Sequence, residues 1–327
     1  MKKFTITAII LLLAVGAMLT ACGSNDDETP QVTINMAVLP GVSSLGAIWL
    51  MENAGNDETE NDYIVEIMGS PEEIPPHIVR GSMDIAAVPT NLASILYNQT
   101  DGGVRVLALS TLGVLHLVDT TGEIHSIEDL RGRTVHLSGM GAAPEFAFSY
   151  VLRQNGLEPG ADVFLEFHAM QPQIAASLEQ GVAEIALLPE PFATTVLMNN
   201  PDVRHALDLS VEWSRVQPDY ALVMTAIIVR TEFLEEHPEA VAAFMRDFER
   251  SINFVNTNVA EAAELAVSFE LIPNVNIAMQ TIPRSNQVFI KGERMQRYMH
   301  GYLSVLYAQL PASVGGALPD DDFYFNR

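Results

Sequence analysis

Histidine side chains are the groups in this sequence best suited to acid–base or metal chemistry, since imidazole is both a general base and a common metal ligand. None of those in its middle part has the His-x-x-x-His or His-Glu-x-x-His spacing of a metal pair, and no Gly-x-Ser-x-Gly nucleophile elbow occurs. We therefore expect no catalytic residue, no metal ion and no cofactor. The residues considered are His116, His125, His136 and His168.

Three side chains, one of them a histidine named above, are candidates for ligand contact. His168 follows an expected strand end, so it either faces a ligand or is structural. Glu190 stands between two prolines at another strand end, where its carboxylate either binds an amine or ring N–H or caps the next helix. Trp213 lies in a polar stretch and could stack on a planar ligand, whereas Trp49 is expected in the core.

Small, polar or glycine-rich loops follow five of the expected strands. Ligands of open α/β sheets bind beyond the carboxyl ends of strands, where helix N-termini offer free amides. The loop 138–142 lacks the third glycine of a dinucleotide motif and the Lys-Ser/Thr of a phosphate loop. The remaining candidate ligand contacts are Gly41, Val42, Ser43, Ser44, Gly69, Ser70, Thr90, Asn91, Gly113, Ser138, Gly139, Met140, Gly141, Ala142 and Phe192.

Strands and helices alternate along the chain, which predicts an α/β fold with mostly parallel sheets. We expect a first passage between two lobes near residues 118–121 and a return in the apolar run 220–229. The aromatic tail 323–325 is expected to dock on the first lobe. Strands are expected at 32–40, 63–68, 83–88, 104–111, 114–118, 134–137, 163–167, 185–188 and 203–209, and the principal helices at 45–53, 71–80, 90–99, 144–155, 172–180, 191–198, 238–256, 259–269 and 291–310.

The composition is that of a globular and strongly acidic protein. The net charge is -24, and it becomes -26 without residues 1–21, which contain Lys2 and Lys3 but no acid. Nucleic acid is excluded as a partner, because binding phosphates requires basic clusters. The acidity also disfavours a strongly anionic ligand.

The N-terminal residues are typical of an export signal. Two lysines precede an apolar run over 6–19, and Leu19-Thr20-Ala21-Cys22 follows. This ending resembles the lipobox of bacterial lipoproteins, in which the cysteine is lipidated and the signal is cleaved before it. We expect a signal peptide over 1–21, lipidation at Cys22, an acidic flexible tether over 22–31 and a place on the extracytoplasmic face of the cell membrane. Cys22 is the single cysteine, so no disulfide is expected.

Three motifs resemble, in order, those of the solute-binding lipoproteins of ABC importers. Gly81–Ala86 and Gly181–Ala186 are similar to a Gly-x-x-Asp-x-Ala step, and Ile127–Val135 is similar to the entry into the second lobe. Within these lipoproteins, the chain resembles the aliphatic-sulfonate, nitrate and thiamine-pyrimidine binding proteins. The resemblance extends from Val32 to about Leu310.

The resemblance implies a two-lobe type II periplasmic-binding-protein fold joined by two hinge strands. Lobe 1 would comprise 32–118 and 222–327, and lobe 2 would comprise 119–221. The implied function is capture of a small solute, heteroaromatic or sulfonate-like, for an ABC permease and its ATPase, without a chemical reaction. Because no arginine stands in the five loops, we favour a neutral or cationic heteroaromatic solute. The alternatives are a pyrimidine-synthesis-type enzyme and a sensor that presents a solute to a receptor.

Overall fold

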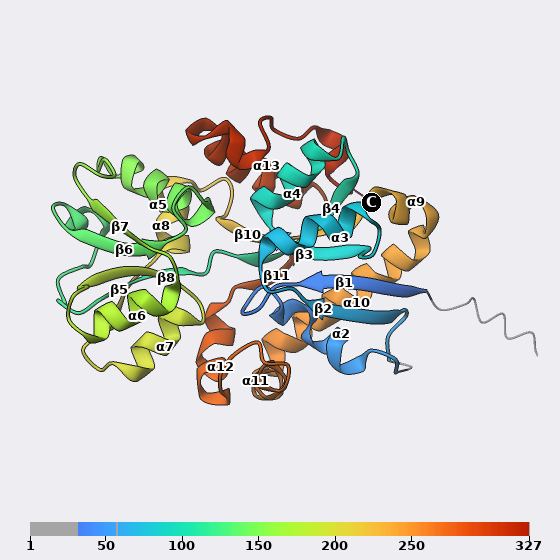
Figure 1. Cartoon of the computed structure of the whole chain (residues 1–327), viewed down its shortest axis with the longest axis horizontal. Coiled ribbons are helices and arrows are strands. Elements are labelled where there is room, and N and C mark those ends of the chain that lie inside the picture. Colours follow the sequence, from blue (N-terminus) through green and yellow to red (C-terminus); the bar gives the residue numbers. More distant parts are fainter. Residues whose placement is uncertain (1–31, 57, 327) are drawn as a thin grey trace, which may run out of the picture. The chain divides into compact units, whose positions relative to one another are not determined.

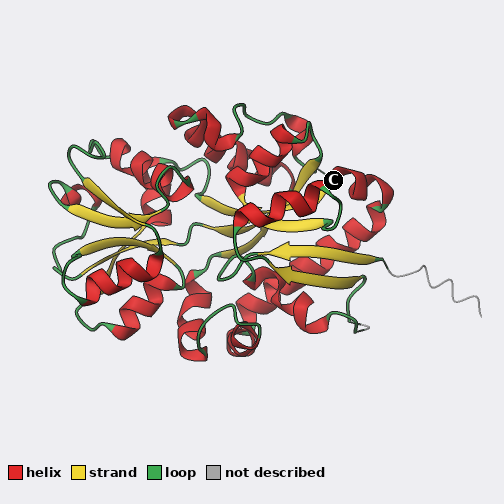
Figure 2. Ribbon diagram, in the orientation of Figure 1, coloured by secondary structure: helices red, strands yellow, loops and turns green. Residues whose placement is uncertain are grey.

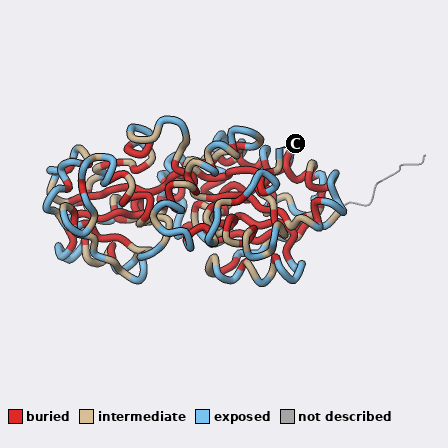
Figure 3. Tube along the Cα trace, turned by 90° about the horizontal axis from the view of Figure 1, so that it is seen from above, coloured by how far each residue is buried: buried red, intermediate tan, exposed pale blue. Residues whose placement is uncertain are grey.

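The computed structural model describes residues 32–56 and 58–326, which form two β-sheets flanked by helices (Figures 1 and 2). The expected signal peptide, the lipidated Cys22 and the tether lie outside the described residues. Figure 3 shows buried segments along the middle of the folded part, with exposed segments around them. This distribution is expected when strands carry the apolar side chains of a core.

The first sheet has six strands in the order β11-β4-β10-β3-β1-β2. Strand β1 is parallel to β2 and β3, whereas β10 is antiparallel to β3 and β4. The bounds are β1 (Thr33–Val38), β2 (Asp62–Ile67), β3 (Ile85–Pro89), β4 (Val104–Leu112), β10 (Val223–Arg230) and β11 (Gln287–Ile290).

The second sheet has five strands in the order β7-β6-β8-β5-β9. Strand β6 is parallel to β7 and β8, whereas β5 is antiparallel to β8 and β9. The bounds are β5 (Leu115–Asp119), β6 (Thr134–Ser138), β7 (Phe164–His168), β8 (Ile185–Pro189) and β9 (Arg204–Asp208).

The expected α/β class is confirmed, but the sheets are mixed rather than mostly parallel. In each sheet one antiparallel strand fills the position beside the third parallel strand: β10 beside β3, and β5 beside β8. Strand β5 follows the first crossing between the sheets, and β10 follows the second. A chain that arrives from the other sheet enters in the direction opposite to that of the parallel strands. Strand β5 therefore belongs to the second sheet, and the first crossing lies at Gly113 and Val114, before the expected 118–121.

Helices cover the faces of both sheets (Figure 1). Helix α10 shows the reason: its buried residues Val241, Phe244, Phe248, Ile252 and Val255 recur every three or four positions and form one apolar face. No helix among the described residues is long and apolar enough to span a membrane. The bounds are α2 (Ile48–Asn53), α3 (Ile74–Val79), α4 (Thr90–Gln99), α5 (Ala143–Gln154), α6 (Gln171–Glu179), α7 (Phe192–Asn199), α8 (Leu209–Val216), α9 (Thr231–Glu236), α10 (Pro238–Thr257), α11 (Val259–Ser268), α12 (Val275–Thr281) and α13 (Gly292–Gln309).

The expected docking of the C-terminal aromatics on the first sheet is confirmed. Tyr324 forms a parallel bridge with Val106 of β4, and the Phe325 amide donates to the Val106 carbonyl at 3.0 Å. Phe323 is fully buried, and its ring centroid lies 5.0 Å from that of Tyr97. The tail therefore completes the packing of this sheet.

Gly113 lies at the first crossing, where the two passages of the chain approach closely. A Cβ atom built on Gly113 would stand 2.3 Å from the Ser210 Oγ and 2.8 Å from a Leu222 methyl carbon. The Gly113 carbonyl also accepts a 2.6 Å hydrogen bond from the Asn286 side chain. This position requires glycine because no side chain fits between these neighbours.

Candidate ligand-binding cavity

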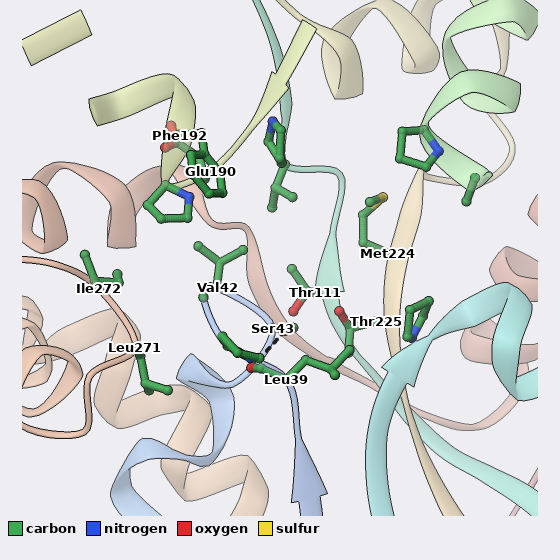
Figure 4. A pocket seen from close by; sticks show the side chains of 18 of the residues that line it. Leu39, Val42, Ser43, Thr111, Glu190, Phe192, Met224, Thr225, Leu271 and Ile272 are labelled. Atoms are coloured by element: carbon green, nitrogen blue, oxygen red, sulfur yellow. Dashed lines mark hydrogen bonds between the residues drawn. The ribbon is translucent and has the colours of Figure 1, made fainter. Parts of the chain in front are cut away.

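A cavity of about 730 Å³ is lined by elements of both sheets (Figure 4). Its volume is in the range of small-molecule sites. Segments far apart in the sequence contribute to it, including the loops after β1, β3 and β8, the crossing strands and the turn between α11 and α12. The lining residues are Leu39, Pro40, Gly41, Val42, Ser43, Pro89, Thr90, Asn91, Thr111, Val114, Ala143, Pro144, Pro189, Glu190, Pro191, Phe192, Thr195, Met224, Thr225, Val267, Glu270, Leu271, Ile272, Pro273 and Tyr302.

The loop after β1 brings small residues and backbone to the cavity wall. Gly41 adopts a φ of 85°, in the left-handed region that glycine enters at little cost. The Ser43 hydroxyl donates to the Leu39 carbonyl at 3.3 Å, and the Ser44 hydroxyl donates to the Gly41 carbonyl at 2.8 Å. These bonds fix the turn so that Ser43 lines the cavity and Ser44 is buried behind it.

Apolar side chains form most of the wall. Figure 4 shows Leu39 and Val42 beside the β1 loop, Phe192 at the start of α7, and Leu271 and Ile272 on the turn after α11. Prolines supply further apolar surface. Such a wall favours a ligand with substantial apolar area, because its burial removes that area from water.

Two buried hydroxyl groups at the wall have no hydrogen-bond partner among the described residues. The Thr111 Oγ1 at the end of β4 and the Tyr302 hydroxyl of α13 both belong to cavity-lining residues that are almost completely buried. A buried hydroxyl without a partner costs free energy. A ligand with hydrogen-bonding groups would remove that cost, so Thr111 and Tyr302 are candidates for orienting it.

Glu190 is held chiefly as a helix cap. Its two carboxylate oxygens accept hydrogen bonds from the Thr194 amide and hydroxyl at 3.1 and 3.0 Å. Burial raises the pKa of Glu190, an effect that the Thr194 hydrogen bonds partly oppose. Its Oε1 also lies 3.6 Å from the Nε2 of His116. The capping interpretation of Glu190 therefore has direct support, and the same residue also lines the cavity.

The charged residues of the lining are both acidic, namely Glu190 and Glu270. Among the described residues that form the wall there is no lysine, arginine or histidine. Anion sites in proteins normally combine cationic side chains with backbone amides. The wall is thus electrostatically unsuited to a multiply charged anion and suited to a neutral or cationic molecule.

Seven residues expected at a ligand site do line the cavity: Gly41, Val42, Ser43, Thr90, Asn91, Glu190 and Phe192. They lie in the segments that directly follow β1, β3 and β8, where α4 begins at Thr90 and α7 at Phe192. Asn91 also donates through its side-chain amide to the Ser313 carbonyl at 3.3 Å. The three segments lie at the carboxyl ends of strands, the positions that the rule of strand ends selects.

The other expected site residues lie outside the wall of this cavity. The loop 138–142 stops just short of it, since Ala143 and Pro144 contribute instead. Gly113 lies at the crossing, beside the lining residue Val114. The residues outside the wall are Ser44, Gly69, Ser70, Gly113, Ser138, Gly139, Met140, Gly141, Ala142, His168 and Trp213.

Trp213 is a core residue and cannot stack on a ligand. It is fully buried in α8, a helix that its polar flanking sequence did not predict. Its ring lies 5.0 Å from that of Tyr150 and 5.7 Å from that of Tyr302, between ring centroids. Trp49 is buried as expected. His168 lies at the end of β7, where it contacts His136 rather than the cavity.

Several lining residues had no signal in the sequence. Thr111, Met224 and Thr225 lie in β4 and β10, where one or two hydroxyl residues in an otherwise apolar run resemble ordinary core. Leu271 and Ile272 follow α11 in a turn without a recognisable motif. Tyr302 lies in the middle of α13, and only the tertiary fold brings it to the wall.

The arrangement of two helix-flanked sheets is similar to that of known structures. The fold is that of the type II periplasmic binding proteins. Within this fold, residues 130–269 match the model of the NMT1-like family. The resemblance expected from the three sequence motifs is thereby confirmed. No curated protein sequence matches the chain.

Three solved type II periplasmic-binding-protein structures illustrate the similarity. An ABC transporter from Parabacteroides distasonis has a TM-score of 0.76 and 20% identity, with 91% of this chain and 100% of that chain covered. The periplasmic aliphatic sulphonate binding protein SsuA from Escherichia coli has a TM-score of 0.71 and 12% identity, covering 90% and 92%. The periplasmic nitrate-binding protein NrtA from Synechocystis PCC 6803 has a TM-score of 0.60 and 15% identity, covering 88% and 84%.

Proposed function

We propose that this chain is an extracytoplasmic solute-binding protein that delivers a small organic molecule to an ABC permease and its ATPase. The observation that carries the proposal is the cavity of about 730 Å³, to which both sheets contribute residues. The fold supports it, because its similar structures include binding proteins of import systems. The protein would act by binding alone, and the ATPase would supply the energy of transport.

The ligand that fits the wall is a neutral or cationic molecule with an apolar, planar body, such as a nitrogen heteroaromatic. The apolar side chains would cover its faces. The hydroxyls of Thr111 and Tyr302, both buried without a partner among the described residues, would form hydrogen bonds to its polar groups. Sulfonates and nitrate are disfavoured, because Glu190 and Glu270 are the charged residues of the described wall.

Two lobes built on the two sheets would close on the ligand. Lobe 1 would carry the β1 to β4 series with β10 and β11, and lobe 2 would carry β5 to β9. The crossings at 113–114 and 217–222 would act as hinges. Contacts made only in the closed state would shift the population toward it.

Attachment to the membrane would follow from Cys22. The lipobox-like ending supports lipidation there, and two acyl chains on one residue are sufficient for stable anchoring. The acidic segment 23–31 would then act as a spacer between the membrane and the folded part that begins at β1.

Thermal unfolding of the fragment 32–327 against a panel of small molecules tests this proposal. The panel contains pyrimidines and thiamine precursors, flavins, amines, alkanesulfonates and nitrate. A ligand at one hundred times its dissociation constant stabilises the folded state by about 2.7 kcal/mol. We expect a rise in melting temperature with a neutral or cationic heteroaromatic compound, and none with nitrate.

Two outcomes would contradict the proposal in different ways. Stabilisation by a sulfonate alone would leave the transport function in place but overturn the assigned ligand class. Turnover of a bound compound by the purified protein would overturn the binding function itself. Uptake of the identified compound by cells should be lost when the gene is deleted and restored by the full chain.

A further inference from the structure

Two histidines and a glutamate meet on one face of the second sheet, away from the cavity. The His136 Nδ1 lies 3.0 Å from the His168 Nε2, and the Glu166 Oε1 lies 3.7 Å from the first and 4.0 Å from the second. Strands β6 and β7, which carry them, lie side by side in Figure 1. One potential ligand atom from each residue thus points to a common centre.

The register of the two strands explains this meeting. His136 of β6 is the direct partner of Glu166 of β7, so their side chains lie on the same face. His168 is two residues after Glu166, and side chains two apart on a strand also share a face. The spacing rules for helical metal pairs could not find this group, because its members come from two strands that are about thirty residues apart.

The separations of the three donor atoms match the size of a first-row transition-metal ion. The nearest point equidistant from all three atoms lies in their plane, about 2.1 Å from each, and zinc bonds to nitrogen and oxygen are about 2.0–2.2 Å long. Neutral imidazole and carboxylate are ligands that zinc prefers.

The two histidine nitrogens lie within hydrogen-bond distance of each other, whereas Glu166 reaches them only at ion-pair distance. Its oxygen lies 3.7 and 4.0 Å from the two histidine nitrogens, beyond hydrogen-bond distance. A cation among the three groups would explain the convergence. The side chains of His136, His168 and Glu166 are 6%, 15% and 56% exposed, so the group is anchored on one side and open to solvent on the other.

We propose that His136, Glu166 and His168 form a binding site for a divalent transition-metal ion, best fitted by Zn²⁺, with a fourth position open to water. Three protein ligands with one open position is an arrangement that zinc adopts. The strongly acidic chain would raise the local concentration of cations near this face. The site is separate from the cavity, and the inference does not depend on the proposed function.

Calorimetric titration of the untagged, chelator-treated fragment 32–327 with ZnCl₂ tests the proposal. We expect one zinc ion per chain in the wild type. Glu166→Gln and His168→Ala should each raise the dissociation constant at least about tenfold, since even the loss of an outer-shell partner costs 10–100-fold. His125→Ala is the matched control, because His125 is exposed and lies outside the group; it should bind as the wild type does.

Absorption of the Co²⁺-loaded protein provides the second readout, because visible bands report on the ligands around the ion. His168→Ala and Glu166→Gln change partly exposed side chains, so circular dichroism should confirm that both variants fold. Failure of the wild type to bind zinc stoichiometrically would overturn the proposal. His116 and His205 form a second histidine pair, with 3.1 Å between the His116 Nδ1 and the His205 Nε2. Binding that survives the double variant His168→Ala/Glu166→Gln, or that is lost only in the double variant His116→Gln/His205→Gln, would also overturn the proposal.

Discussion

The indole of Trp213 packs against the ring of Tyr302 with 5.7 Å between ring centroids, although the two residues belong to α8 and α13. Tyr302 lines the cavity, whereas Trp213 is fully buried behind it. The Trp213 Nε1 donates to the Tyr220 carbonyl at 3.0 Å, in the segment that returns to β10. These contacts link the cavity wall to one of the two crossings.

Trp213 should therefore report ligand binding by its fluorescence. In the Trp49→Phe variant, a ligand that contacts Tyr302 should shift or quench the remaining emission, because it changes the environment of a ring in contact with Trp213. The measurement is a fluorescence titration of this variant with the ligand found by thermal unfolding. The complementary Trp213→Phe variant should give little response, and an equal response from Trp49 would contradict the assignment.

Removal of the unpartnered hydroxyls should weaken binding without loss of stability. Tyr302→Phe and Thr111→Val each remove a buried hydroxyl that lacks a partner among the described residues. We expect each to raise the dissociation constant about three- to tenfold, which corresponds to a hydrogen bond of about 0.5–1.5 kcal/mol. The free energy of unfolding of the empty protein should stay constant or rise.

Tyr324→Phe is the control for these hydroxyl variants. The Tyr324 hydroxyl is also buried and unpartnered among the described residues, but Tyr324 docks on β4 and does not line the cavity. Its variant should bind as the wild type does. Equal weakening by Tyr324→Phe would show that these hydroxyls act on stability rather than on the ligand.

Gly113→Ala should destabilise the protein, because its Cβ atom would stand 2.3 Å from the Ser210 Oγ. Overpacking of this kind costs about 1–3 kcal/mol, measurable by denaturant unfolding. Gly69→Ala is the matched control: its Cβ atom would meet the end of the Glu73 side chain at 3.0 Å, which can move away. A Gly113→Ala protein as stable as Gly69→Ala would show that the crossing can adjust.

Stability should fall as the pH drops from about 6.5 to 4, through His116. Burial lowers the pKa of His116 to about 4, and the charges of His205 and Arg284 act in the same direction while that of Asp208 opposes them. The unfolded chain, with a histidine pKa of about 6.5, thus binds a proton that the folded chain excludes. Because the unfolded chain binds more protons, the free energy of unfolding falls by up to about 3 kcal/mol between pH 6.5 and pH 4.

Unfolding free energies of the wild type and of His116→Gln at several pH values between 7 and 4 test this linkage. The variant should lose less stability than the wild type over this range, because it lacks the buried group that excludes the proton. An identical decline in both proteins would assign the acid sensitivity to other groups.

Most of the secondary structure could be predicted from local patterns, and the topology only in part. Apolar runs predicted most of the strands, and proline or serine at the start of a segment predicted most of the helices, with bounds close to those observed. Helix α8 was missed, because Glu212 and Arg215 made its sequence polar while only Leu209 and Trp213 supplied large buried apolar side chains. The direction of β5 and β10 was missed, since local sequence contains no information on which sheet a strand joins.

Some residues of the candidate site could likewise be predicted from the sequence, and others could not. Gly41, Thr90 and Glu190 follow strand ends, and a general rule of α/β sheets finds such positions. Thr225 and Tyr302 line the cavity from the interior of a strand and of a helix, so only the packing of distant segments brings them there. The same limit hid the contact of His136 with Glu166, which depends on strand register.

The place of β10 between β3 and β4 has a consequence for the order of assembly during synthesis. The five strands of the second sheet are all present once residue 208 has been made. The first sheet must wait for β10 at 223–230 and for β11 at 287–290. Until residue 230 has been made, the edges of β3 and β4 that face β10 remain unpaired. Unpaired strand edges invite association with other chains. A nascent or truncated chain that ends near residue 220 should therefore be the most aggregation-prone form of this protein.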